Sequence, residues 1–237
     1  MHRFFLTAGL MLAGFLPGFL SGFLSLGQTA LAQDASQPVY IVTYVEVAPK
    51  AADEARKLFL GYAREARKAS GAVQVDALQR MSDPGHFALV EQWQSLAAKQ
   101  AFAATDPATK FRAALNPLQS AAYDERIHAA LSVGASKPLS NDAVVILTHV
   151  DVVPKEVESG TAKVKGFVEE GRNASGNLRF DDVVQANRKN HFTVIEGWKS
   201  AADKSAWISS KTARSFREEL QPMSGALYDE RAYRIVR

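Results

Sequence analysis

An internal repeat constrains this chain more than any other feature. Tyr123-Asp124-Glu125-Arg126 recurs as Tyr228-Asp229-Glu230-Arg231, 105 residues later. The same offset superposes residues 39–126 on residues 144–231 without a gap, and 32 of these 88 positions are identical. Unrelated segments would agree at only a handful of positions, so the chain carries one module twice.

Each module contains alternating and helical patterns in a fixed order. In the first copy, period-two alternation predicts strands over residues 39–47, 73–80 and 86–92, and a last strand over 121–129. Helical spacing predicts a helix over residues 53–69 that ends at Ser70-Gly71. A second, broken helix is expected from its N-cap at Ser95 to Leu115, before Pro117. The order βαββαβ is that of a ferredoxin-like unit.

The first strand is apolar on both faces, as expected for a sheet that is covered on both sides. Two helices cover one face of a four-stranded sheet and leave the other uncovered. The second module can cover it through a pseudo-twofold relation, as in a closed dimer. We therefore expect the two sheets to face each other as a partly closed barrel within one chain.

The N-terminal segment differs from the modules. Residues 4–26 are apolar and uncharged, and Ala30-Leu31-Ala32 has the small-x-small pattern of a signal peptidase site. We expect a signal peptide over residues 1–32, and export to the periplasm without stable membrane association after cleavage. An uncleaved N-terminal anchor is the alternative. The remaining boundaries are a first domain at 39–131, a linker at 132–142 and a second domain at 143–237.

Composition excludes several classes of site. The chain has no cysteine, so thiolate catalysis, thiolate metal sites and disulfides are excluded. Arg3 is the only charged side chain in residues 1–32, so 27 of the 28 Lys and Arg residues remain against 25 acids. This balance gives no electrostatic footprint for nucleic acid. No spacing of histidines predicts a metal site.

Several motifs resemble those of a known family. The runs Ser70-Gly71-x-Val73-x-Val75-Asp76 and Phe87-x-Leu89-Val90-Glu91-x-Trp93, and their second copies at 175–181 and 192–198, are similar to antibiotic biosynthesis monooxygenase domains. The resemblance covers nearly all of residues 39–237. It implies an intramolecular dimeric α+β barrel formed by two ferredoxin-like βαββαβ modules.

The same resemblance implies a chemistry. Such enzymes oxidise quinols or polyketide aromatics with molecular oxygen and need no metal or flavin, so no cofactor is expected, and the expected partner is a small aromatic or quinone-like molecule. The family often has Pro-His-Phe in its second helical region, where this chain has Pro107-Ala108-Thr109 and Thr212-Ala213-Arg214. Haem-degrading relatives need a helix histidine and a strand asparagine, which are not found here.

Glu91 and Glu196 are the candidate catalytic residues. Each lies between apolar residues of one strand face, and a lone buried carboxylate is costly. The functional interpretation is a general base of raised pKa that deprotonates a phenol. The structural interpretation is an ion pair with Arg112 or Arg126, or with their copies.

Further residues are candidates for lining a substrate cavity. Trp93 and Trp198 can stack on an aromatic ring or fill the core, and the histidines can be semi-exposed strand ends. The tyrosines can bind a quinol oxygen or close the sheet edge. The full set is Trp198, Trp93, His191, His86, Tyr228, Tyr123, Arg217 and Arg112.

Two functions remain open at this stage. One is a cofactor-independent monooxygenase of small aromatic or quinol-type compounds in the periplasm, with the active cavity expected in the second half, whose motifs match better. The other is a non-catalytic module that binds small molecules or protects against stress. Further homo-oligomerisation is also left open.

Overall fold

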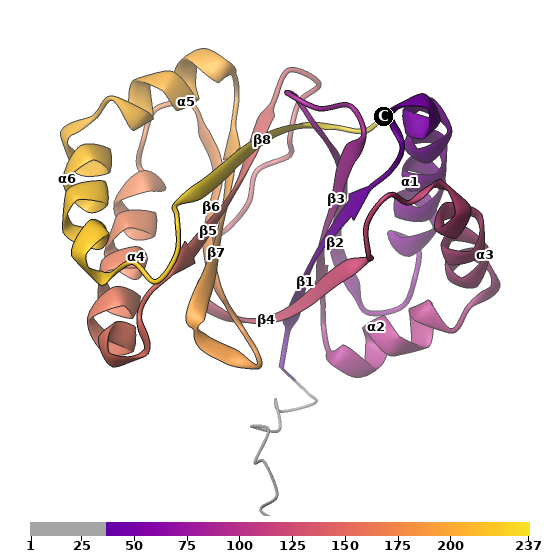
Figure 1. Cartoon of the computed structure of the whole chain (residues 1–237), viewed down its shortest axis with the longest axis horizontal. Helices are drawn as coiled ribbons and strands as arrows, with labels where there is room; N and C mark the ends of the chain where they lie inside the picture. The colour runs from indigo at the N-terminus through magenta and orange to yellow at the C-terminus, as the bar shows by residue number, and fades with distance from the viewer. Residues whose placement is uncertain (1–36) are drawn as a thin grey trace, which may run out of the picture. The chain divides into compact units, whose positions relative to one another are not determined.

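The computed structural model describes residues 37–237, so the predicted signal peptide lies outside the described residues. Both halves have the expected order (Figure 1). The first half consists of β1 (Val39–Glu46), α1 (Ala52–Ala66), β2 (Ala72–Arg80), β3 (His86–Trp93), α2 (Leu96–Ala103), α3 (Asp106–Leu115) and β4 (Asp124–Ser132). The second consists of β5 (Val144–Asp151), α4 (Val157–Gly171), β6 (Asn177–Gln185), β7 (Arg188–Trp198), α5 (Ala201–Ile208), α6 (Lys211–Leu220) and β8 (Asp229–Ile235).

Local chemistry explains where the elements begin and end. Ser95 and Ser200 cap α2 and α5, and each hydroxyl accepts a hydrogen bond from the backbone N–H three residues later. Gly71 and Gly176 follow the first helix of each half with φ of 80° and 77°. A side chain at Gly176 would also bring its Cβ within 2.2 Å of Asp203 Cγ. Only glycine fits this turn without strain.

The eight strands form one closed antiparallel barrel in the order β1-β3-β2-β8-β5-β7-β6-β4. The predicted fold, two ferredoxin-like modules in an intramolecular α+β barrel, is confirmed, and closure is complete where partial closure was expected. Two seams join the halves, β2 with β8 and β4 with β6. Figure 1 shows the two sheets facing each other with the helices outside.

The last strand of the first half differs from the prediction. The expected strand over 121–129 is β4 at Asp124–Ser132, which starts later and extends further. The reason is that β4 serves both halves: residues 124–128 pair with β1, and residues 128–132 pair with β6. The single module supplies no partner for the second part, so its sequence pattern alone did not reveal the extension.

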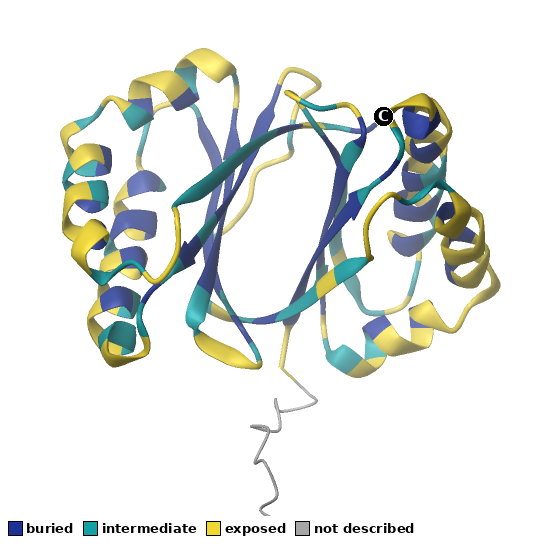
Figure 2. Cartoon of the chain, in the orientation of Figure 1, coloured by how far each residue is buried: buried dark blue, intermediate teal, exposed yellow. Residues whose placement is uncertain are grey.

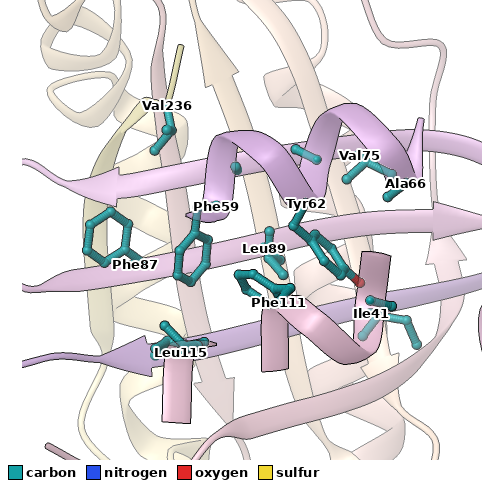
Figure 3. Close-up of a cluster of buried hydrophobic side chains, with 14 of the residues drawn as sticks. Ile41, Phe59, Tyr62, Ala66, Val75, Phe87, Leu89, Phe111, Leu115 and Val236 are labelled. Carbon is teal, nitrogen blue, oxygen red and sulfur yellow. The ribbon is translucent and has the colours of Figure 1, made fainter. Parts of the chain in front are cut away.

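Three apolar clusters fill the molecule. One lies between sheet and helices in the first half, around Phe59, Leu89 and Phe111 (Figure 3). The second half has the equivalent cluster around Phe167 and Trp198. The third fills the barrel interior between the sheets, and it includes Val42 and Ile195. Figure 2 shows β1, β3, β5 and β6 mostly buried, β4 and β8 largely intermediate, and the outer helix faces exposed.

No helix within residues 37–237 is both long and apolar enough to cross a membrane.

Candidate functional site

Glu91 lies on the helix-facing side of the first sheet and is fully buried. Tyr62 donates a hydrogen bond to its carboxylate at 2.9 Å, and the Lys99 ammonium lies 3.2 Å away. Lys99 also contacts Glu125 at 3.3 Å. Burial raises the pKa of Glu91, and the charge of Lys99 opposes this shift. The predicted ion pair therefore exists, but its cation is Lys99 and not Arg112 or Arg126.

Glu196 occupies the equivalent position with one substitution in its surroundings. Phe167 stands where the first half has Tyr62 and cannot donate, and the Trp198 indole donates to Glu196 instead, at 2.7 Å. Lys204 is paired with Glu196 at 3.0 Å and with Glu230 at 3.2 Å. Burial raises the pKa of Glu196 and Lys204 opposes it. Both acids are thus anchored by a buried lysine.

Aromatic side chains fill the space around these acids. Trp93 packs on Phe102, and Trp198 packs against Phe180 and Trp207, with ring centroids 5.4–6.1 Å apart. Both tryptophans are fully buried. Neither acid and neither tryptophan lines any of five cavities of 350–630 Å³ found among residues 37–237.

The tyrosines and arginines predicted to line a cavity also lie outside these five. The Arg112 guanidinium lies 3.3 Å from the ring centroid of Tyr123, a cation–π contact. Arg217 donates to the backbone oxygen of Ile208. Burial raises the pKa of Tyr123 and of Tyr228 far above the usual value, so both phenols stay protonated.

His191 is different, because it does line a cavity. This cavity of about 540 Å³ lies at one mouth of the barrel, between the start of β4 and the β6–β7 hairpin. His191 Nδ1 lies 2.9 Å from a carboxylate oxygen of Asp151, the last residue of β5 and also part of the lining. Among the described residues, no hydrogen-bond partner is found for Nε2. An imidazole held in this way presents Nε2 as a proton acceptor.

Arg126 closes the inner side of the same cavity. Its guanidinium is paired with Asp124 at 2.6 Å and lies 2.8 Å from Nε2 of His149. The cavity therefore combines a histidine–carboxylate pair with a guanidinium, from strands β4, β5 and β7. The remaining lining residues are Glu125, Ile127, Gln185, Ala186, Asn187 and Arg188.

Behind Arg126, a hydrogen-bonded ring connects the two halves. Arg126 donates to His149, His149 contacts the Thr193 hydroxyl at 3.4 Å, and Thr193 contacts His128 at 3.1 Å. His128 Nδ1 returns to the backbone oxygen of Arg126 at 3.0 Å. Each contact has a donor and an acceptor when both imidazoles are neutral. Burial lowers the pKa of each histidine to about 4, with the nearby Arg126 charge acting in the same direction.

The first half does not repeat this arrangement. His86, the counterpart of His191, lies 3.8 Å from Glu46, and its Nδ1 faces Arg80 at 3.3 Å. Sequence reasoning identified His191, named Arg126 only as an ion-pair partner of Glu91, and missed Asp151 and His149. The available signal was His149 itself, a histidine at the position where the first half has Tyr44.

The comparisons with known proteins agree with this architecture. The family model for antibiotic biosynthesis monooxygenase matches residues 38–114 and 143–219. The chain belongs to this family. No curated protein has a matching sequence.

Solved structures show the same fold as this antibiotic biosynthesis monooxygenase-family chain at low identity. A protein from Fusobacterium nucleatum, described provisionally as a monooxygenase, has a TM-score of 0.79 at 16% identity, over 85% of this chain and 94% of its own. A second such protein, from Lactobacillus acidophilus, has a TM-score of 0.72 at 12% identity, over 85% and 95%. An anthrone oxidase-like protein has a TM-score of 0.65 at 8% identity, over 86% and 93%.

The departure from the family pattern has a structural consequence. Ala108 and Ala213 stand where antibiotic biosynthesis monooxygenase domains often have a helix histidine, and both are buried against the aromatic clusters. The small side chains let the helices pack closely over the sheet.

Within residues 37–237, no group of three or more His, Asp or Glu side chains is arranged to hold a metal ion.

Proposed function

We propose that this chain is a cofactor-independent monooxygenase of small phenols or quinols, acting in the periplasm. The observation that carries the proposal is the His191–Asp151 pair beside Arg126 in the cavity of about 540 Å³. This volume lies within the range of small-molecule sites. Family membership supports oxidation of a small molecule, and the predicted signal peptide supports the location.

The residues of the cavity have separate roles in this mechanism. Asp151 orients the imidazole, and His191 Nε2 accepts the proton of the substrate hydroxyl. The Arg126 guanidinium stabilises the phenolate that forms. The electron-rich ring then reduces oxygen: one oxygen atom bonds to a ring carbon, the ring is oxidised to a quinone with loss of one C–H and one O–H hydrogen, and these two hydrogens leave with the other oxygen atom as water. All electrons come from the substrate.

Oxygen consumption over a panel of hydroquinones tests the proposal. His191→Gln removes the base and should lower kcat at least about a hundredfold, because general base catalysis contributes 10²–10⁴-fold. His86→Gln, the matched change in the first half, should leave the rate unchanged. Equal rates for wild type and His191→Gln would overturn the proposal.

A specific observation favours binding without turnover as the second candidate. The predicted catalytic acids Glu91 and Glu196 are enclosed by aromatic side chains and paired with lysines, so neither carboxylate is free to act as a general base on a bound molecule. Saturable quinol binding with no oxygen uptake would select this alternative.

A further inference from the structure

The outer edges of β2 and β6 are equivalent in the repeat but are covered differently. The chain that follows β4 continues along the start of β6. The backbone N–H of Lys137 donates to the backbone oxygen of Leu178 at 2.8 Å. The backbone N–H of Gly134 donates to the Asp181 carboxylate at 3.0 Å. Residues 133–137 therefore lie along the edge of β6 beyond the point where β4 ends.

The same stretch of β2 has no such cover. Its pairing with β8 stops at Ala77, whose backbone oxygen accepts a hydrogen bond from Val236 N–H at 2.7 Å. Within residues 37–237, no backbone group of another segment pairs with residues 72–76 on the side away from β3. The Arg67 side chain reaches this edge and donates to the backbone oxygen of Val75 at 2.8 Å. The edge of β2 is thus open where that of β6 is covered.

The open edge carries the same acceptors that residues 133–137 use on β6. Val73 stands at the position of Leu178, and both lie in an irregularity of register against the neighbouring strand. Asp76 stands at the position of Asp181, so the carboxylate that accepts from a backbone N–H is also repeated. A backbone running antiparallel to β2 would find both acceptors in the same places.

A groove occupies the space beside this edge. It has a volume of about 630 Å³ and lies between α1, β2, the end of β8 and residues 136–139. The second half fills the equivalent space, because a Cβ added to Gly134 would lie only 2.7 Å from Nε of Arg172. Arg172 is the counterpart of Arg67, which lines the groove. The groove therefore corresponds to the place that an extended backbone occupies in the other half.

The lining of the groove favours an acidic occupant. The cations Arg67, Lys137 and Arg237 line it, and Asp76 is the one acid among its lining residues. The charge of Asp76 is already opposed by the buried Arg179, at 3.5 Å. Positive side chains in excess attract a segment that carries carboxylates.

We propose that the open edge of β2 is a docking site for an extended acidic segment of a partner protein, which lies antiparallel to β2 as an added strand. Main-chain hydrogen bonds to Val73 and Asp76 would align the segment, and its carboxylates would contact Arg67 and Lys137. Leu60 and Val73, two of the four large apolar side chains exposed among the described residues, lie at this surface. The groove shares no lining residue with the cavity of His191.

A synthetic peptide tests the proposal by NMR titration of the whole mature chain. The probe has the sequence of residues 132–139 with glutamates in place of Ser136 and Lys137, and is acetyl-Ser-Val-Gly-Ala-Glu-Glu-Pro-Leu-amide. Chemical shifts should change at Arg67 and residues 72–76, and not at residues 177–181. A control peptide with lysines at the two substituted positions should bind at least about tenfold more weakly at low salt.

A second control tests strand pairing separately from charge. N-methylation of the second glutamate, which stands at the position of Lys137, removes the N–H expected to donate to the backbone oxygen of Val73. Loss of this hydrogen bond should raise the Kd about tenfold. Equal Kd values for the probe and its N-methylated form would overturn the proposal, because charge alone would then account for binding.

Two charge-matched variants localise the site. Arg67→Glu should raise the Kd of the probe at least about tenfold. Arg64→Glu makes the same change at an exposed position of α1 outside the groove and should leave the Kd unchanged. The proposal fails if Arg67→Glu binds the probe like the wild type, or if the shifts fall on residues 177–181. It also fails if the chain without peptide forms a dimer that Arg67→Glu abolishes, since a second copy would then be the occupant.

Discussion

At the residue scale, the equivalent acids Glu91 and Glu196 stabilise the fold through their lysine partners. Glu196 accepts hydrogen bonds from Trp198 and Lys204 in a fully buried setting. Removing its charge leaves Lys204 with only the partly exposed Glu230 as partner. Breaking one side of a buried ion pair typically costs about 3–5 kcal/mol.

We therefore expect Glu196→Gln to lower the free energy of unfolding by about 2–4 kcal/mol. This is less than the full cost of breaking the pair, because the amide keeps some of the hydrogen bonds. Glu230→Gln, at the exposed end of the same lysine, should cost less than about 1 kcal/mol. Urea denaturation measures both. A Glu196→Gln protein with unchanged stability and a lost oxygenase rate would instead assign Glu196 the predicted role of general base.

The histidines of the hydrogen-bonded ring predict a pH dependence. The pKa values of His128 and His149 are lowered to about 4 in the folded state, against about 6.5 when unfolded. As the pH falls, the histidines of the unfolded chain bind protons before those of the folded chain. The contribution of His128 and His149 to the free energy of unfolding is therefore fully present above pH 6.5 and is lost as the pH falls towards 4. Asp182, with its pKa raised to about 8, acts in the opposite direction, because protonation favours its folded form.

A comparison of variants separates these contributions. His149→Tyr, which installs the residue found at position 44, should flatten the decline of stability between pH 6.5 and 4 by up to about 3 kcal/mol. Urea midpoints measured across this range provide the test. An identical slope in wild type and variant would show that the pKa of His149 does not differ between the folded and unfolded states, so that His149 does not contribute to the pH dependence.

At the scale of elements, the sequence predicted the βαββαβ order of each half, because the strands and helices have strong periods and clear terminating residues, while the broken second helix is two helices, α2 and α3. Gly71 and Gly176 mark the ends of the first helices, and Ser95 marks the start of the next. The extension of β4 to Ser132 could not be predicted, since it depends on pairing with β6 of the other half. The site was only partly predictable: His191 was identified, Asp151 meets it through the β5–β7 pairing within the second half, and Arg126 of the first half joins them only when the barrel closes.

The glycines of α4 and its following turn provide a test at this scale. Gly176→Ala should lower the free energy of unfolding by about 1–3 kcal/mol, because φ is 77° and the new Cβ would meet Asp203. Gly166→Ala, inside α4 with no atom within 4 Å of the new Cβ, should raise it by about 0.5–1 kcal/mol. Thermal denaturation of the two variants should shift in opposite directions. Equal destabilisation would contradict this assignment.

At the scale of the whole molecule, duplication has allowed the halves to diverge around a shared barrel. Tyr44 and His149 are equivalent positions that meet inside it, with ring centroids 5.3 Å apart. The first half contributes Arg126 to the cavity that holds His191 of the second half. A symmetric dimer of identical modules would place the same residues at both mouths. Fusion in one chain permits one mouth to keep the histidine–carboxylate pair while the other changes.

The barrel also makes the halves depend on each other. The interior cluster draws on both, and includes Val42 and Val90 from the first half and Leu147 and Ile195 from the second. A separated half would expose its share of this apolar face and the unpaired edges of β2 and β4. We therefore expect residues 37–131, expressed alone, to self-associate or to remain unfolded.

Light scattering with circular dichroism tests this expectation. The isolated first half should elute as a dimer or larger species, and dilution should unfold it because its stability depends on association. Mixing it with residues 132–237 should restore a one-to-one complex with the strand pairs β2–β8 and β4–β6. A folded monomeric half at low concentration would contradict the conclusion that closure of the barrel supplies the missing core.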